Sequence, residues 1–237
     1  MSQHSGVTRW LLPGLSALLI GAALSVAVPD AAVAAKKPPQ EWDGLQRREN
    51  KRLDNVYVRP NVQFTAYKSV RLDPVEVQFD KDWDPNRSAV TLSQRLSKDD
   101  IQRIRADLSK VFREEFAERL SKGGYPLVDE DGDDVLRVQA ALINVYINAP
   151  DTSMQTAGRS RTYVMDAGRM TVVMQLQDSV TGQVLARVVD TKQGSSTGRL
   201  QWSTSVSNSA EARRAFGDWA DALRRGLDVV NGKTPSK

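Results

Sequence analysis

The stretch Met170–Thr191, MTVVMQLQDSVTGQVLARVVDT, decides the fold. Its two halves, 170–177 and 184–191, are apolar runs of strand length rich in β-branched residues, which favours β-strands over helices. The polar connection between them contains Thr181 and Gly182, a pair that favours a hairpin turn. The stretch therefore predicts two neighbouring antiparallel strands.

Three further strands are predicted on the N-terminal side of this hairpin. Val135–Ile147 is long and dense in Val, Leu, Ile and Tyr, and Tyr125–Val128 is short. Tyr67–Phe79 alternates with period two but shifts its phase across Pro74. Because proline lacks the N–H that a sheet ladder needs, we expect this interrupted strand near a sheet edge.

Two amphipathic helices are predicted around these strands. Ser97 opens the first, with Asp100 as the acid of a capping box, and a glycine pair at 123–124 ends it. The second opens at Asn208 and ends at Gly232. The apolar stripe of the first is Ile101, Ile104, Leu108, Val111, Phe112, Phe116 and Leu120, and that of the second is Ala212, Phe216, Trp219, Leu223, Leu227 and Val230.

The fold class follows from the order of these elements. Each helix has one apolar face, so each must cover something flat and apolar, which the strands supply. We therefore predict an α+β fold, with a mainly antiparallel sheet and two amphipathic helices packed on one face.

Composition excludes several classes of chemistry. The chain has 237 residues, no cysteine and a single histidine, His4. His4 lies in the N-terminal segment that is expected to be removed, so the mature chain has neither residue. It can therefore form no Ser-His-Asp or Cys-His nucleophile, no Cys/His zinc site and no disulfide. The net charge is +4, with basic and acidic residues interleaved along both helices, so we expect no nucleic-acid partner. We expect no cofactor and no enzymatic activity.

The N-terminal segment 1–34 has the layout of a secretory signal. An apolar run, Trp10–Val28, is followed by small residues at Ala32 and Ala34, which predicts cleavage near Ala34/Ala35. The alternative is an uncleaved anchor, although the run is barely long enough to span a bilayer and is interrupted by Pro13 and Gly14. Without a cysteine the chain cannot be lipid-anchored, so we expect a periplasmic or secreted protein.

The mature chain is expected to have three parts. Residues 35–55 are charged and poor in apolar side chains, which predicts an N-terminal arm or linker anchored only by Trp42 and Leu45. Residues 56–232 form the single α+β domain. The last residues, 233–237, are expected to be a frayed tail.

The loop 148–168 is the more unusual of two candidate sites. A connection of this length without predicted structure is uncommon inside a domain, and such loops are functional or simply mobile. Its arginines offer planar donors to carboxylate or phosphate groups, unless the acids of the loop satisfy them. The candidate binding residues are Asn148, Asp151, Arg159, Arg161, Tyr163 and Arg169.

The acidic run 129–134 is the second candidate site. Its alternating carboxylates Asp129, Asp131 and Asp133 suit calcium, but the run lacks the glutamate that closes a twelve-residue calcium loop. The alternative is a solvated turn between two strands, whose charges discourage edge pairing. Calcium is therefore only a weak candidate here.

Several short motifs together carry a family resemblance over about residues 41–230. The motifs are Trp42-Asp43-Gly44-Leu45, the segments 54–60, 72–77, 148–151 and 157–161, and Asp178-Ser179-Val180-Thr181-Gly182. In their order they resemble the bacterial domain-of-unknown-function family 3313, which contains exported and lipoprotein-like envelope proteins. The resemblance implies an envelope protein and no known catalytic residues. The order of elements is also similar to small envelope accessory domains, such as one from the Tol system.

These observations favour a non-enzymatic periplasmic accessory or adaptor protein of the cell envelope. Its expected partner is an envelope protein, met by the 148–168 loop and the charged arm. One alternative is a binder of an anionic ligand, an anionic lipid or a cell-wall fragment. A carboxylate-dependent hydrolase is a further alternative, which needs two acids facing each other across a cleft.

Overall fold

A computed structural model of the chain describes residues 38–87, 95–147, 162–164, 168–193, 201–203 and 205–233. They all belong to one compact unit, Pro38–Lys237. The predicted signal segment 1–34 and the last four residues of the predicted tail lie outside the described residues.

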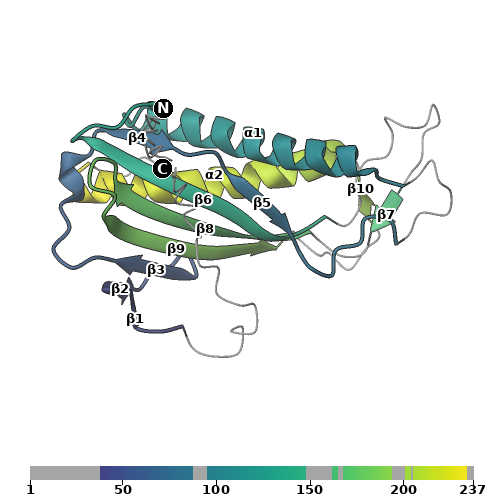
Figure 1. Ribbon diagram of the computed structural model, residues 1–237, viewed down its shortest axis with the longest axis horizontal. Coiled ribbons are helices and arrows are strands. Elements are labelled where there is room, and N and C mark those ends of the chain that lie inside the picture. Colours follow the sequence, from purple (N-terminus) through teal and green to yellow (C-terminus); the bar gives the residue numbers. More distant parts are fainter. Residues whose placement is uncertain are drawn as a thin grey trace, which may run out of the picture. The chain divides into compact units, whose positions relative to one another are not determined.

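Eight strands form the main sheet, in the spatial order β1-β2-β3-β9-β8-β6-β4, and β5 also pairs with β6 (Figure 1). All pairs are antiparallel except those of β4 and β5 with β6. A second, two-stranded sheet pairs β7 with β10. The strands are β1 Glu41–Trp42, β2 Leu45–Arg48, β3 Asn55–Val58, β4 Ser69–Leu72, β5 Glu76–Phe79, β6 Val135–Tyr146, β7 Thr162–Val164, β8 Arg169–Asp178, β9 Val184–Gln193 and β10 Gln201–Ser203.

The predicted hairpin is confirmed as β8 and β9. Its turn is held by Asp178, whose carboxylate accepts hydrogen bonds from the backbone N–H and the hydroxyl of Thr181, both at 2.7 Å. Gly182 has a φ of 70°, a left-handed conformation in which glycine has no steric penalty. The Thr-Gly pair therefore has the role that the sequence indicated.

The interrupted strand at 67–79 is also confirmed. It forms β4 and β5, which both run parallel to β6 and are separated at Asp73 and Pro74. The position at the edge of the sheet matches the expectation from the missing proline N–H. The predicted short strand 125–128 is reduced to a single bridge between Val70 and Leu127.

Two long helices, α1 Lys98–Lys122 and α2 Ser205–Val230, are present, with a short 3-10 turn, η2, at Phe64–Ala66. The capping box is confirmed, because the Ser97 side chain accepts from the Asp100 backbone and the Asp100 carboxylate accepts from the Ser97 backbone. The second helix begins three residues before the predicted Asn208. Neither helix in the described part of the chain is long and apolar enough to cross a membrane.

The core lies between the sheet and the two helices. Phe112 and Phe116 of α1 stack at 4.1 Å between ring centroids, and Phe216 of α2 meets Phe112 edge-on. The buried indole of Trp219 donates to the Asp190 carboxylate of β9 at 2.7 Å, which joins α2 to the sheet. Helices and strands therefore share one apolar cluster, and the predicted α+β class is confirmed.

The prediction of a charged arm at 35–55 needs correction. Residues 41–48 form β1 and β2, which extend the sheet beyond β3. Asp43 and Gly44 turn the chain with positive φ values of 51° and 75°, and Leu45 is fully buried. The composition argument failed because a strand at a sheet edge needs only one buried side chain and backbone pairing, not an apolar face of its own.

Candidate functional site

The two faces of the sheet differ in chemistry. On β6, Leu136, Val138 and Leu142 are buried in the core beneath the helices. The residues between them alternate to the opposite side, as strand geometry requires. We call this side, which lies opposite α1 and α2, the outer face.

One row of polar side chains crosses the outer face from strand to strand. The pairing register places Gln139 of β6 beside Gln175 of β8, and Gln175 beside Arg187 of β9. It continues from Arg187 to Tyr57 of β3 and from Tyr57 to Arg47 of β2. Members of this cross-strand row, in spatial order, are Asp73, Gln139, Gln175, Arg187, Tyr57 and Arg47.

Hydrogen bonds connect the first four members of the row. Arg187 donates through Nε to Gln175 at 3.0 Å, and Gln175 donates to Gln139 at 3.5 Å. Gln139 in turn donates to the Asp73 carboxylate at 3.2 Å. These bonds fix side chains from three strands, and that of Asp73 from the break between β4 and β5, in one arrangement on the surface.

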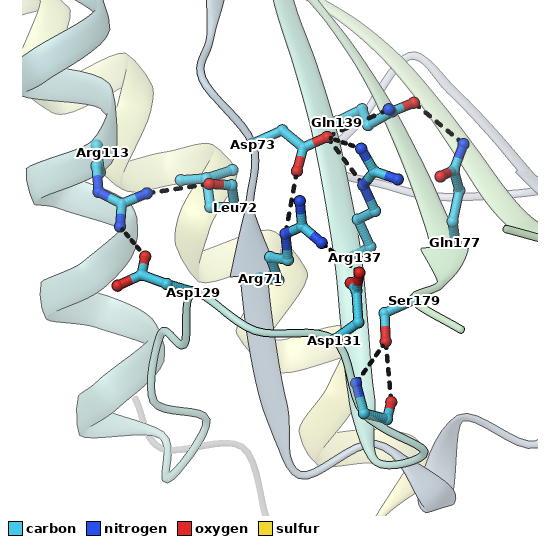
Figure 2. A network of polar contacts seen from close by, with 11 residues as sticks. Arg71, Leu72, Asp73, Arg113, Asp129, Asp131, Arg137, Gln139, Gln177 and Ser179 are labelled. Atoms are coloured by element: carbon cyan, nitrogen blue, oxygen red, sulfur yellow. Dashed lines mark hydrogen bonds and ion pairs between the residues drawn. The ribbon is translucent and has the colours of Figure 1, made fainter. Parts of the chain in front are cut away.

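Asp73 is the centre of the charged end of the row (Figure 2). One oxygen of its carboxylate accepts two hydrogen bonds from the Arg137 guanidinium, at 2.9 and 2.7 Å. The other oxygen lies 3.6 Å from Nε of Arg71. Two arginines and an amide therefore hold one carboxylate, of which only 13% is exposed.

Arginines also engage the acidic turn predicted as a weak calcium candidate. Asp131 pairs with Arg71, and Asp129 pairs with Arg113, which also donates to the Leu72 carbonyl at 3.0 Å (Figure 2). Asp133 is exposed on the same turn. Among the residues that the structure describes, no group of three or more metal-ligating side chains is placed to hold an ion.

Ser179 fixes the acidic turn to the β8–β9 hairpin. Its hydroxyl accepts from the backbone N–H of Gly132 at 3.0 Å and donates to the carbonyl of the same residue at 2.9 Å (Figure 2). Ser179 therefore holds the turn through both the N–H and the carbonyl of Gly132, and two arginines hold it through Asp129 and Asp131. This is the geometry of a structural turn between strands.

Two aromatic rings, those of Trp42 and Tyr57, pack together at the other end of the row. The Arg187 guanidinium lies over the indole of Trp42, 4.6 Å from its centroid, and pairs with Asp43 in the β1–β2 turn. Trp42 meets the buried ring of Tyr57 edge-on at 5.6 Å. Burial raises the pKa of Tyr57, and the positive charge of Arg47 lowers it in part.

A half-buried apolar strip runs beside the polar row. It consists of Ala141, Val173 and Val189, which pair with one another across β6, β8 and β9. None of the three belongs to the core cluster under the helices. The outer face therefore combines an ordered polar row with adjacent apolar surface, a composition found in protein interfaces.

Four of the six residues predicted as a site in the 148–168 loop, Asn148, Asp151, Arg159 and Arg161, lie outside the described residues. Tyr163 lies in β7, where its backbone pairs with Trp202.

Arg169, the sixth predicted residue, begins β8. Its guanidinium pairs with Asp80 at 2.6 Å and lies over the ring of Tyr146. The hydrogen bond from Arg169, followed by that from the Asp82 backbone N–H, lowers the pKa of Asp80. Arg169 therefore joins the ends of β5, β6 and β8.

The sequence interpretation missed the polar row, although its signal was present. Arg137 and Gln139 alternate with Val and Ala on β6, and Gln175 and Gln177 alternate with Met and Leu on β8. Such alternation marks a solvent-facing side of a strand. Which of these side chains meet, however, depends on strand order and register, which a single sequence does not contain.

Comparison with known families supports the resemblance. A family model described as "Protein of unknown function (DUF3313)" matches residues 35–223. No curated protein matches the chain.

Solved structures with similar chain traces include three bacterial proteins. The PelC dodecamer from Paraburkholderia phytofirmans is 12% identical, with a TM-score of 0.35, over 69% of this chain and 94% of that one. A minor lipoprotein from Acinetobacter baumannii is 14% identical, with a TM-score of 0.32, over 70% and 94%. A DUF4136 family protein from Bacteroides thetaiotaomicron is 11% identical, with a TM-score of 0.33, over 80% and 98%.

Proposed function

We propose that this chain, which belongs to the DUF3313 family of proteins of unknown function, is a non-enzymatic accessory protein of the cell envelope that binds a protein partner. The outer face described above is the surface that we assign to this binding. The protein is periplasmic or secreted after cleavage near Ala34/Ala35, as its N-terminal segment predicts.

The polar row beside the apolar strip is the observation that carries this proposal. Side chains on a free sheet face lose conformational freedom when a partner binds, at about 0.5–1.5 kcal/mol for each long side chain. Hydrogen bonds already fix Arg187, Gln175 and Gln139 before any partner arrives. Such pre-organisation lowers the cost of association and favours a binding role for this face.

The chemistry of the outer face supports binding over hydrolysis. A carboxylate hydrolase needs two acids separated by a space for the scissile bond. Asp73 and Asp131 are instead joined through Arg71, which occupies the space between them (Figure 2). The only histidine of the chain, His4, falls in the predicted signal segment.

Most described arginines of the candidate sites already have an acidic partner. Arg71, Arg137, Arg169 and Arg187 each pair with a carboxylate of the chain. An anionic ligand would therefore have to compete with these pairs, which favours a protein partner for the face as a whole.

The 148–168 loop is a second part of the proposed contact surface. Arg159 and Arg161 supply planar donors for carboxylates of a partner. Arg169 fixes the start of β8 where this loop ends, since it is bound to Asp80.

Site-specific crosslinking tests the proposal. A photoreactive residue at Val173 on the outer face should trap a specific envelope protein in intact cells. The matched control is Lys110, which is exposed on α1. Capture of the same proteins from both positions, or of none from Val173, would contradict the assignment of the outer face.

Two companion experiments separate the parts of the proposal. Replacing Arg159 and Arg161 together with alanine should weaken the crosslink, whereas an unchanged crosslink removes the loop from the contact surface. N-terminal sequencing of the exported protein should begin at Ala35. A protein that starts at Met1 would instead have an uncleaved anchor.

A further inference from the structure

The end of α2 carries the only Asn-Gly pair of the chain, Asn231 and Gly232. Gly232 has a φ of 66°, the left-handed conformation in which many helices end and which favours glycine. Its N–H donates to the Val229 carbonyl at 3.2 Å, and the N–H of Lys233 donates to the Asp228 carbonyl at 2.9 Å. These two bonds form the Schellman motif of a helix C-terminus, which explains why a glycine follows Asn231.

An asparagine followed by glycine is chemically reactive, because glycine has no side chain that keeps its backbone nitrogen away from the asparagine amide. The backbone nitrogen of Gly232 attacks Cγ of Asn231, the Cγ–Nδ2 bond breaks, and the amide leaves as ammonia with the proton of the attacking nitrogen. The product is a five-membered succinimide. Water then opens this ring at one of its two carbonyls and leaves aspartate or isoaspartate. The reaction needs only water.

The fold holds both reacting groups of this pair. The attacking nitrogen of Gly232 already donates its hydrogen within the helix end. The side-chain amide of Asn231 donates to the Leu227 carbonyl at 2.9 Å and to the Tyr125 hydroxyl at 3.4 Å, and its oxygen accepts from Lys68 at 3.3 Å. Because the amide must turn towards the backbone nitrogen to react, these contacts slow the reaction in the folded protein.

The same contacts join the end of α2 to two other parts of the fold. Tyr125 follows the end of α1, and Lys68 directly precedes β4. An aspartate at this position cannot donate to Leu227 or Tyr125, and its negative charge is unfavourable at a helix C-terminus. An isoaspartate lengthens the backbone by one methylene group and breaks the Schellman motif. Either product therefore loosens the end of α2.

From this arrangement we propose that Asn231 is a modification site. It deamidates spontaneously, the folded end of α2 restrains the reaction, and the product releases that end from Tyr125. The change runs in one direction, because the ammonia is lost. The site goes beyond the proposed partner binding and does not depend on it.

Peptide mapping by mass spectrometry of the mature chain, incubated at neutral pH, tests the reaction. The peptide that contains Asn231 should gain about 1 Da. The rate should be roughly tenfold or more higher in guanidinium chloride than in buffer, because unfolding frees both reacting groups. Asn61 is the internal control: it is exposed but is followed by the branched Val62, so it should stay unmodified in both solvents.

Two variants test which contacts restrain the pair. Tyr125→Phe and Lys68→Met each remove one contact of the Asn231 amide. Both should raise the rate in buffer several-fold and leave the rate in guanidinium chloride unchanged. Lys110→Met, which removes an exposed charge from α1, is the matched control and should change neither rate.

The variant Asn231→Asp supplies one of the two products directly. Amide hydrogen exchange in the last turn of α2 should be several-fold faster in this variant than in the natural chain. Gln78→Glu is the matched control, because it adds the same charge at an exposed position of β5. It should leave the exchange of α2 unchanged.

The proposal is overturned if Asn231 stays unmodified in guanidinium chloride, or if it reacts equally fast in both solvents. It also fails if neither contact variant reacts faster in buffer, or if Asn231→Asp leaves hydrogen exchange at the end of α2 unchanged. None of these outcomes involves the Val173 crosslink, so failure here leaves the proposed partner surface to its own test.

Discussion

Asp73 shows how much depends on one side chain of the outer face. Its carboxylate is 13% exposed and holds Arg71 and Arg137, which are 28% and 26% exposed. Asp129, in contrast, is 90% exposed in its pair with Arg113. Both are arginine–aspartate pairs, but solvent screens the attraction between the charges far more strongly in the exposed pair than in the half-buried one.

We predict that Asp73→Asn lowers the free energy of unfolding by about 1–3 kcal/mol, because two half-buried guanidinium groups lose their carboxylate. Asp129→Asn should cost about 0–1 kcal/mol. Urea denaturation of both variants measures the difference. Equal losses would mean that the Asp73 cluster is no stronger than a surface pair.

Single residues with a local role were predictable, and residues with distant partners were not. Asp100 forms its capping box with Ser97, only three residues away, so the sequence contains the whole motif. Asp73 bonds Arg137 across 64 residues of sequence. No local pattern of Asp73 identifies that partner, because it depends on β4 lying beside β6.

At the scale of elements, the contact between α1 and α2 is held by charge as well as by the aromatic core. Arg119 of α1 pairs with Asp221 of α2 at 2.7 Å, and Arg213 of α2 pairs with Glu115 of α1 at 3.1 Å. The Arg119 guanidinium lies against Gly217, where a Cβ atom would come within 2.6 Å of its nitrogen. The glycine thus makes room for the arginine.

Two glycines of α2 give a matched pair of predictions. Gly226→Ala should raise the free energy of unfolding by about 0.5–1 kcal/mol, since nothing lies within 4 Å of the new methyl group and alanine favours the helix. Gly217→Ala should lose this gain, because the methyl group displaces Arg119 from Asp221. Thermal unfolding of both variants makes the comparison.

A double variant provides the control. In an Arg119→Ala background the displaced side chain is absent, so Gly217→Ala should regain the stabilisation seen at Gly226. If Gly217→Ala is stabilising in the natural background as well, the contact with Arg119 contributes nothing.

The sequence predicted most of the elements because their signals are local. Helix caps, the β8–β9 turn and the break at Pro74 all lie within a few residues of the structure they determine. The strands β1 and β2 were missed because they are short and charged, and they exist only where β3 offers a partner. Tertiary context decides such strands.

At the scale of the whole molecule, the free energy of unfolding depends on pH because two carboxyl groups and two tyrosines have shifted pKa values in the folded protein. Hydrogen bonds from Thr181 lower the pKa of Asp178, and the Arg169 contact lowers that of Asp80. Burial, with a hydrogen bond to Asp178, raises the pKa of Tyr67 to about 12. Burial also raises that of Tyr125 to about 12.

The signs of these pKa shifts predict that the free energy of unfolding is highest at intermediate pH and falls on both the acid and the alkaline side. We call the two falling parts of this profile the acid limb and the alkaline limb. The lowered carboxyl groups stabilise the fold above their unfolded pKa of about 4, and this contribution is lost as the pH falls through their folded pKa. The raised phenols stabilise it below their unfolded pKa of about 10, and this contribution is lost as the pH rises towards 12.

Unfolding free energy measured from pH 2 to pH 12 tests this expectation. Asp178→Asn should flatten the acid limb, and Tyr67→Phe should flatten the alkaline limb while lowering the free energy of unfolding at intermediate pH by about 1 kcal/mol for the lost hydrogen bond. If the acid and alkaline limbs keep their slopes in both variants, groups other than Asp178 and Tyr67 cause the pH dependence.

The pairing of β3 with β9 has a consequence for how the chain folds during synthesis. Asn55 meets Val189, and Val58 meets Ala186, so each contact closes a very long loop, which slows folding. The first three strands are made well before β9 exists, and the backbone pairing of β1 and β2 with the rest of the sheet runs only through β3. We therefore expect this N-terminal edge to join the sheet last, which keeps the nascent chain incompletely folded until its C-terminal half is made.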